Sequence, residues 1–257
     1  MSQFSEYSQR FECIQMRRED GILEVRFHSN GGPFQWGLGP HKEFEQAFLD
    51  ISRDPDNEVV ILTGTGDEYC GPTLAAGGHR HVKDPLTPQQ WDAIYWEGKH
   101  LLGNLLNIEV PVIAAINGPT TRHAEIPLLS DIVIASNTAT FQDSAHVNGG
   151  LVPGDGVHVV FPALLGLNRG RYFLLTGQVL DAQQALDYGL ISEVLEPDQV
   201  LPRAWVLARQ LLQRPRLIRR YARVLLTQDI KRRMHELLGY GLALEGLGAC
   251  MAREQVG

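Results

Sequence analysis

The sequence has little cysteine, no long apolar run and no excess of positive charge. Its three cysteines, Cys13, Cys70 and Cys250, are far apart and odd in number, so neither a disulfide framework nor a paired zinc site is expected. No apolar run approaches the roughly 20 residues that span a bilayer, and the N-terminus shows no basic-then-apolar signal pattern. We therefore expect a reduced, cytoplasmic protein that does not enter a membrane.

The charge balance argues against a further class of partners. The 257 residues carry a formal net charge of −7, which disfavours nucleic acid or an anionic membrane as the main partner. Hydrophobic residues make up 44% of the chain and charged residues 21%, as in ordinary globular proteins. A chain of this length can bury a full core, so we expect a globular protein.

Short apolar runs alternate with segments of helical periodicity, which predicts an α/β protein. An Asp-Gly pair at Asp20 and Gly21 separates two apolar runs and predicts a β-hairpin. Asp181 is expected to be the N-cap of a helix. The hairpin strands are expected at 11–16 and 22–27, buried strands at 59–62, 111–116 and 132–135, and helices at 40–52, 88–106, 168–175, 181–188 and almost throughout from 202 onward.

A series of phrases in a fixed order suggests a family. An apolar run at 111–118 precedes Thr-Thr-Arg-His-Ala-Glu-Ile-Pro at 120–127, Phe-Gln-Asp-Ser-Ala-His at 141–146 and Val-Pro-Gly-Asp-Gly at 152–156. This order resembles the crotonase (enoyl-CoA hydratase/isomerase) superfamily over about residues 11–230. The resemblance implies a β-spiral core of repeated ββα units at 1–200. It also implies a helical C-terminal region at 201–257 that takes part in trimer contacts.

The residues at the family's working positions depart from the family pattern. Thr120–His123 replace a run of glycines, and Ala145 stands where hydratases carry a glutamate. His123 therefore lies at a helix start where the family gathers its oxyanion donors, and its imidazole could donate to the same oxygen. The alternative is that His123 caps the helix and faces solvent.

His146 and Asp155 are the candidate general-base pair. His146 follows the usual hydratase glutamate position by one residue, and histidine suits a general base near neutral pH. A carboxylate on the other ring nitrogen would fix its tautomer, and Asp155 follows nine residues later. The alternative is that His146 is an ordinary loop histidine whose hydrogen bonds are satisfied by its surroundings.

Glu125 matches a second catalytic glutamate of many hydratases, but Pro127 follows where the family helix continues, so Glu125 is either catalytic or structural.

The segment that forms the other half of the family's oxyanion hole is also altered. Pro72 and Thr73 replace small residues and aspartate within 69–74, so a backbone donor at Gly71 and acyl-CoA binding are both in doubt. Cys70 lies where the family often has an unreactive cysteine and is a poor candidate nucleophile.

No cofactor is expected, because the sequence has neither a P-loop nor a G-x-G-x-x-G motif, and a G-x-S-x-G nucleophile elbow is absent too. His79 and His81 have an alternating spacing that could recruit a metal ion. A charged loop is the simpler interpretation of this pair, so no metal is expected either.

The departures from the crotonase pattern described above match a narrower group within the superfamily. The phrases already quoted, together with Asn-Arg-Gly-Arg-Tyr-Phe-Leu-Leu-Thr-Gly-Gln at 168–178, are similar to those of 6-oxocamphor hydrolase and related β-diketone hydrolases. That group cleaves a carbon–carbon bond between two carbonyls without CoA. The resemblance implies a homotrimer or a dimer of trimers that acts on a small diketone. It implies as site residues His123, His146 and Asp155, with Trp36, His41 and Glu245 as further candidates.

Each further candidate also has a structural interpretation. Trp36 could be an ordinary core residue, His41 an exposed residue of a first helical turn, and Glu245 part of a solvated helical face. Two other functions also stay open. One is an enoyl-CoA hydratase or isomerase that uses Glu125, and the other is a non-catalytic crotonase-like binding protein.

Overall fold

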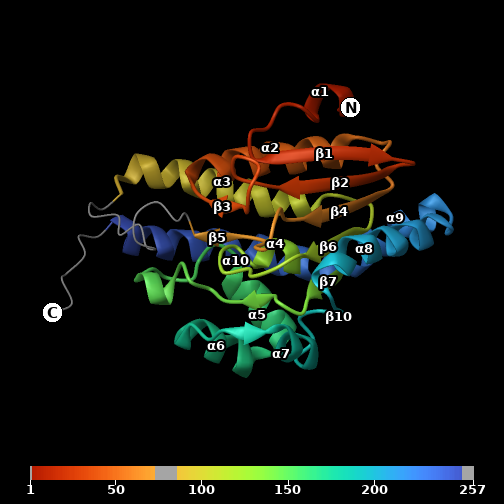
Figure 1. The fold of residues 1–257 in the computed structure, drawn as a ribbon. Coiled ribbons are helices and arrows are strands. Elements are labelled where there is room, and N and C mark those ends of the chain that lie inside the picture. The colour runs from red at the N-terminus through yellow and green to blue at the C-terminus, as the bar shows by residue number, and fades with distance from the viewer. Residues whose placement is uncertain (1, 73–85, 251–257) are drawn as a thin grey trace.

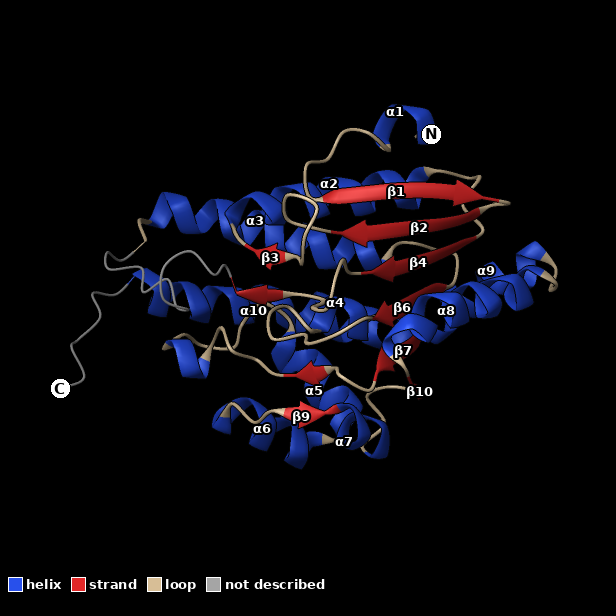
Figure 2. Ribbon diagram, in the orientation of Figure 1, coloured by secondary structure: helices blue, strands red, loops and turns tan. Residues whose placement is uncertain are grey.

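A computed structural model describes residues 2–72 and 86–250 of the protein. Its main sheet has six strands in the order β1-β2-β4-β6-β7-β10. β1 and β2 are antiparallel, and the other neighbours are parallel, as Figure 2 shows. The strands are β1 (Ile14–Glu19), β2 (Ile22–Phe27), β4 (Val59–Thr63), β6 (Val112–Ile116), β7 (Ile132–Ser136) and β10 (Glu193–Leu195).

The predicted hairpin forms around the expected turn. Asp20 and Gly21 both have positive φ, 51° and 80°, which a two-residue hairpin turn of type I′ requires. The expected first strand at 11–16 is placed wrongly, because β1 begins at Ile14 and continues up to the turn. The buried strands β4, β6 and β7 agree with their predicted positions within one residue.

Helices cover both faces of the sheet (Figure 1). Because side chains alternate along a strand, Ile61 and Ile113 face α8 (Pro197–Leu212). Val60 and Leu62 face the other side, where the larger core lies. That core is closed by α2 (Leu38–Arg53), α3 (Pro88–Leu106), α5 (Val157–Leu165) and part of α10 (Gln228–Cys250).

The remaining elements are shorter. Two small sheets pair β3 (Gln35–Trp36) with β5 (Gly71–Pro72), and β8 (Thr140–Phe141) with β9 (Leu180–Asp181). The other helices are α1 (Phe4–Tyr7), α4 (Glu125–Leu128), α6 (Leu167–Thr176), α7 (Ala182–Asp187) and α9 (Arg216–Leu226), with a short 3-10 helix at Val147–Gly149. The predicted helices agree with α2, α3, α6 and α7 within two residues.

Asp181 caps α7, since its carboxylate accepts the backbone N–H of Gln184 at 2.8 Å, as predicted. The division of the chain at residue 200 stays a prediction, although α8 continues across that position. Among the described residues, no helix combines the length and apolar character that crossing a membrane requires.

Candidate active site

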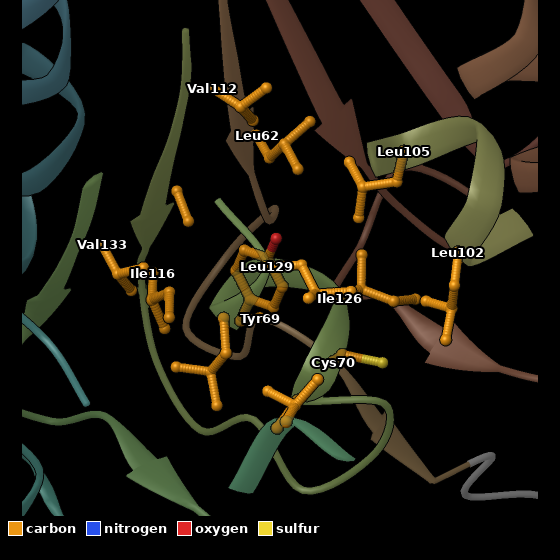
Figure 3. Packing of buried hydrophobic residues seen from close by; sticks show 14 of the residues in the cluster. Leu62, Tyr69, Cys70, Leu102, Leu105, Val112, Ile116, Ile126, Leu129 and Val133 are labelled. Atoms are coloured by element: carbon orange, nitrogen blue, oxygen red, sulfur yellow. The ribbon is translucent and has the colours of Figure 1, made fainter. Parts of the chain in front are cut away.

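The start of α4 is fixed by core packing. Ile126 and Leu129 are buried in the main core with Leu62 of β4 and Leu105 of α3 (Figure 3). The helix is a single turn, and Pro127 fits within it because a first-turn residue needs no partner for its N–H. This packing also restrains His123, which lies two residues before α4.

His123 occupies a backbone conformation that favours glycine. Its φ is +48°, in the left-handed region that costs a residue with a side chain roughly 1–2 kcal/mol. The family's glycine at this position therefore has a physical reason, and strain of this kind is typical of functional sites. The alternative of a solvent-facing capping histidine is wrong, because the side chain is only 11% exposed and α4 has no side-chain cap.

A close backbone contact positions Asp155 against α10. A Cβ on Gly154 would lie 2.2 Å from the carbonyl oxygen of Gly241 and 2.8 Å from Cβ of Glu245. Only glycine allows the loop to lie this close to the helix. Asp155 therefore lies beside Glu245, and Gly156, at φ +113°, starts α5 directly afterwards.

His146 is buried among three carboxylates. Its Nδ1 lies 2.7 Å from Oδ1 of Asp143. Its Nε2 lies 3.4 Å from Oδ2 of Asp155 and 3.4 Å from Oε1 of Glu245. The imidazole therefore has an acidic neighbour at both ring nitrogens.

His123 connects these carboxylates to the aromatic rings of Trp36 and His41. Its Nδ1 lies 2.7 Å from Oε1 of Glu125 and 3.4 Å from Oδ2 of Asp155. Its ring centroid is 3.9 Å from that of Trp36 and 5.4 Å from that of His41. Asp155 thus lies between the two histidines, and the structure brings together every residue that the sequence proposed for the site.

The acidic partner of His146 differs from the one that the sequence indicated. Asp155 was expected on the ring nitrogen opposite the reactive one, as the residue that fixes the tautomer. In the structure Asp143 makes the short contact with Nδ1, and Asp155 lies on the Nε2 side. Asp143 is the residue that sequence reasoning missed. The available signal was its place in Phe-Gln-Asp, three residues before His146, where a carboxylate can reach back to the same loop.

The two histidines have opposite electrostatic environments. Burial by itself lowers the pKa of His146, but Asp155, Asp143 and Glu245 together raise it well above its ordinary value. Burial lowers the pKa of His123 to about 4, and the attraction of Asp155 offsets this only in part. Burial and His123 lower the pKa of His41 to about 3. His123 and His41 are therefore neutral near pH 7, whereas the carboxylates around His146 favour its protonated form.

Two of the carboxyl groups resist ionisation. Burial raises the pKa of Asp155 to about 7, against the opposing attraction of His146. Burial also raises the pKa of Glu125 to about 8. Near neutral pH, protons are therefore distributed among the histidines and carboxyl groups of the site. One step of the titration then belongs to this whole set of residues and not to a single one.

In the described part of the segment around Cys70, the candidate backbone donor is occupied and the thiol is buried. The N–H of Gly71 donates to the carbonyl of Phe34 at 3.0 Å, so this candidate backbone donor is already used. Burial raises the pKa of the Cys70 thiol well above its ordinary value, which disfavours the nucleophilic thiolate. Residues 73–85, which include His79 and His81, lie outside the described residues.

One group within the cluster has donors suited to a metal ion. Among the described residues, ligand atoms of His123, Glu125 and Asp155 lie within 4.8 Å of one another. Imidazole and carboxylate donors are those that zinc accepts. The expectation that no metal takes part stays a prediction.

The sequence model of the enoyl-CoA hydratase/isomerase family matches residues 21–241. The chain belongs to this family. A carnitinyl-CoA dehydratase from Salmonella arizonae is 31% identical over 79% of this chain and 75% of its own length.

Solved structures of this family show the same fold. A β-diketone hydrolase from the cyanobacterium Anabaena sp. PCC 7120, bound to (S)-3-oxocyclohexyl acetic acid, is 49% identical with a TM-score of 0.89, over 95% of this chain and 97% of that chain. An enoyl-CoA hydratase/isomerase from Mycobacterium paratuberculosis is 22% identical with a TM-score of 0.85, over 95% of this chain and 96% of that chain. The predicted crotonase-type fold is confirmed.

Proposed function

We propose that this member of the enoyl-CoA hydratase/isomerase family is a β-diketone hydrolase that cleaves a cyclic or bulky 1,3-diketone by a retro-Claisen reaction. The observation that carries the proposal is the buried link His146–Asp155–His123, with 3.4 Å contacts on both sides of Asp155. Similarity to the Anabaena β-diketone hydrolase supports it. The keto acid bound to that protein has the functional groups that hydrolysis of a cyclic diketone produces.

The first chemical step is attack by water on one carbonyl. His146, in its deprotonated form, accepts a proton from water at Nε2, which faces Asp155 and Glu245. The hydroxide adds to the carbonyl carbon and forms a tetrahedral intermediate. The bond between this carbon and the central carbon then breaks, and its electron pair passes to the second carbonyl as an enolate.

The second step requires stabilisation of the enolate oxygen. His123 is neutral near pH 7 because burial lowers its pKa to about 4, and a neutral imidazole has one N–H. Glu125, with a pKa of about 8, can donate to Nδ1 and leave the N–H of His123 on Nε2 for the enolate oxygen. Trp36, with its ring 3.9 Å from that of His123, lies where it can assist or bind the diketone. Preorganised donors of this kind commonly make a large contribution to catalysis. Protonation of the enolate carbon then gives a keto acid.

The hydratase alternative would use Glu125. Burial raises the pKa of this carboxyl group to about 8, which suits a proton donor, but its Oε1 is already paired with Nδ1 of His123. Ala145 provides no second carboxylate. Turnover of an enoyl-CoA ester would favour this alternative over the diketone hydrolase. Tight binding of RNA without turnover of either substrate would favour the other alternative, a non-catalytic crotonase-like binding protein.

Labelled water tests the proposed reaction directly. Incubation of the protein with a panel of cyclic 1,3-diketones in water enriched in the heavy oxygen isotope is expected to give a keto acid with one labelled oxygen in its carboxylate. Mass spectrometry measures the label. A parallel reaction in heavy water should place deuterium on the carbon that receives the enolate proton. An absence of cleavage across the panel would contradict the proposal.

Assembly gives a second prediction. Apolar side chains are exposed on α9 and α10, with Leu225 and Leu226 at 75% and 77% exposure, and such a surface marks a contact site. We propose that this face packs against other copies of the chain in a trimer or a dimer of trimers. Light scattering is expected to give three or six times the chain mass of 28.6 kDa. A stable monomer at micromolar concentration would contradict this.

A further inference from the structure

Asp143 is the residue that makes the shortest polar contact to His146. Its Oδ1 lies 2.7 Å from Nδ1, and the two side chains are only 4% and 3% exposed. The corresponding contacts of His146 Nε2 with Asp155 and Glu245 are both 3.4 Å, which is long for a charge-assisted hydrogen bond. Asp143 therefore provides the tightest contact on the ring.

We propose that Asp143 is the positioning residue of His146. Its carboxylate accepts the Nδ1–H and thereby leaves Nε2 as the nitrogen that exchanges a proton on the side of Asp155. This inference rests on the proposed hydrolase function for its kinetic consequence, but the contact and the tautomer are properties of the protein itself. Asp155 then has a different role: it stands between the two histidines and shares protons with both.

The surroundings of Asp143 support this assignment. Its second oxygen, Oδ2, is buried and has no hydrogen-bond partner among the described residues. The side chain makes no ion pair with arginine or lysine among them, although Arg122 is close enough to feel its charge. A buried carboxylate without such a pair is costly, so the contact with the imidazole is the interaction that offsets its burial.

The tautomer follows from hydrogen-bond chemistry. An ionised carboxylate can only accept, so Nδ1 must carry the hydrogen when it lies against Asp143. A neutral His146 then has a free lone pair on Nε2 and can act as a base there. If Asp155 alone oriented the ring by accepting a hydrogen from Nε2, the lone pair would lie on Nδ1 and would point away from His123.

Other groups also affect the titration of His146 and must be considered in any test. They are Asp155 before α5, His158 on α5, Glu245 on α10, Glu125 on α4 and His123 before α4. Arg122 acts on the neighbouring Asp143 and Asp155. Each of these groups remains in an Asp143 variant, so a change in that variant reports the loss of one carboxylate.

The test is nuclear magnetic resonance of protein labelled with ¹⁵N in its histidines. In the unaltered protein, His146 is expected to titrate above its ordinary pKa and, when neutral, to carry hydrogen on Nδ1. In Asp143→Asn, which keeps the side-chain shape, we expect titration at lower pH and a mixture of tautomers. A His146→Gln variant assigns the resonance. Asp54→Asn, which alters a buried aspartate bonded to Tyr7 and Arg18, is the matched control and should leave His146 unchanged.

Kinetics provide the second measurement. Asp143→Asn is expected to lower kcat on a diketone by about 10²–10⁴-fold, the range of general-base contributions, with KM little changed, while Asp143→Glu should recover part of the rate. Unchanged titration and tautomer in Asp143→Asn would overturn the inference even if the protein cleaves diketones. Altered titration in a protein that cleaves no diketone would uphold the role of Asp143 and contradict the proposed function. If Asp143→Asn fails to fold, the unaltered protein still decides the matter, because hydrogen on Nε2 in place of Nδ1 of the neutral His146 ring would overturn the inference.

Discussion

Replacement of His146 by alanine is expected to lower kcat by about 100-fold or more, since removal of a general base has effects of this size. The imidazole is buried against Asp143, Asp155 and Glu245. Asp155→Asn should cause a loss of similar size, because Asp155 lies 3.4 Å from both histidines. Steady-state kinetics on a diketone measure both effects. Near-normal turnover in both variants would remove this pair from the mechanism.

The pH dependence of the unaltered enzyme should report the same residue. A base must be deprotonated, so activity rises as the pH passes the pKa of His146. Three carboxylates raise that pKa well above 6.5 against the opposing effect of burial. The acid limb of the pH–rate profile is therefore expected above pH 6.5, where Asp155, with a pKa of about 7, contributes to it. In His146→Ala the limb should vanish or move.

Replacement of His123 by alanine is expected to slow turnover by about 10²–10³-fold, the usual cost of losing one oxyanion donor. Because the pKa of His123 is lowered to about 4 by burial, it stays neutral throughout the working pH range. The acid limb should therefore persist in His123→Ala at a lower plateau, and diketone binding measured by calorimetry should be preserved. Loss of the limb in this variant, with its retention in His146→Ala, would mean that the two roles are reversed.

A second variant separates the His123 side chain from its backbone strain. His123→Gly removes the imidazole and also allows the φ of +48° without a steric penalty. His123→Ala removes the imidazole but keeps the strain. Equal loss of activity in the two variants would attribute the effect to the imidazole, whereas recovery in the glycine variant would attribute it to the backbone.

Much of the secondary structure of the main sheet and its helices could be predicted from local sequence patterns. Continuous apolar runs predict the buried strands β4, β6 and β7, and the capping residue Asp181 predicts the start of α7. Local signals of this kind depend on neighbouring residues, so they can be read along the chain. The start of β1 was placed wrongly, because the apolar residue Phe11 precedes the strand and packs against the core from a loop.

The sequence also named the residues of the candidate site, but their pairing depended on the tertiary structure. Trp36, His123, His146 and Glu245 lie far apart in the chain, and tertiary packing brings their elements together, as the burial of α4 and the contact of Gly154 with α10 show. The partner of His146 was assigned to Asp155 from the motif, whereas the short contact is with Asp143. The protonation states also depend on the tertiary structure. The surrounding carboxylates raise the pKa of His146, whereas burial lowers that of His123. A pKa depends on the distances and burial of all neighbouring groups, which no linear motif contains.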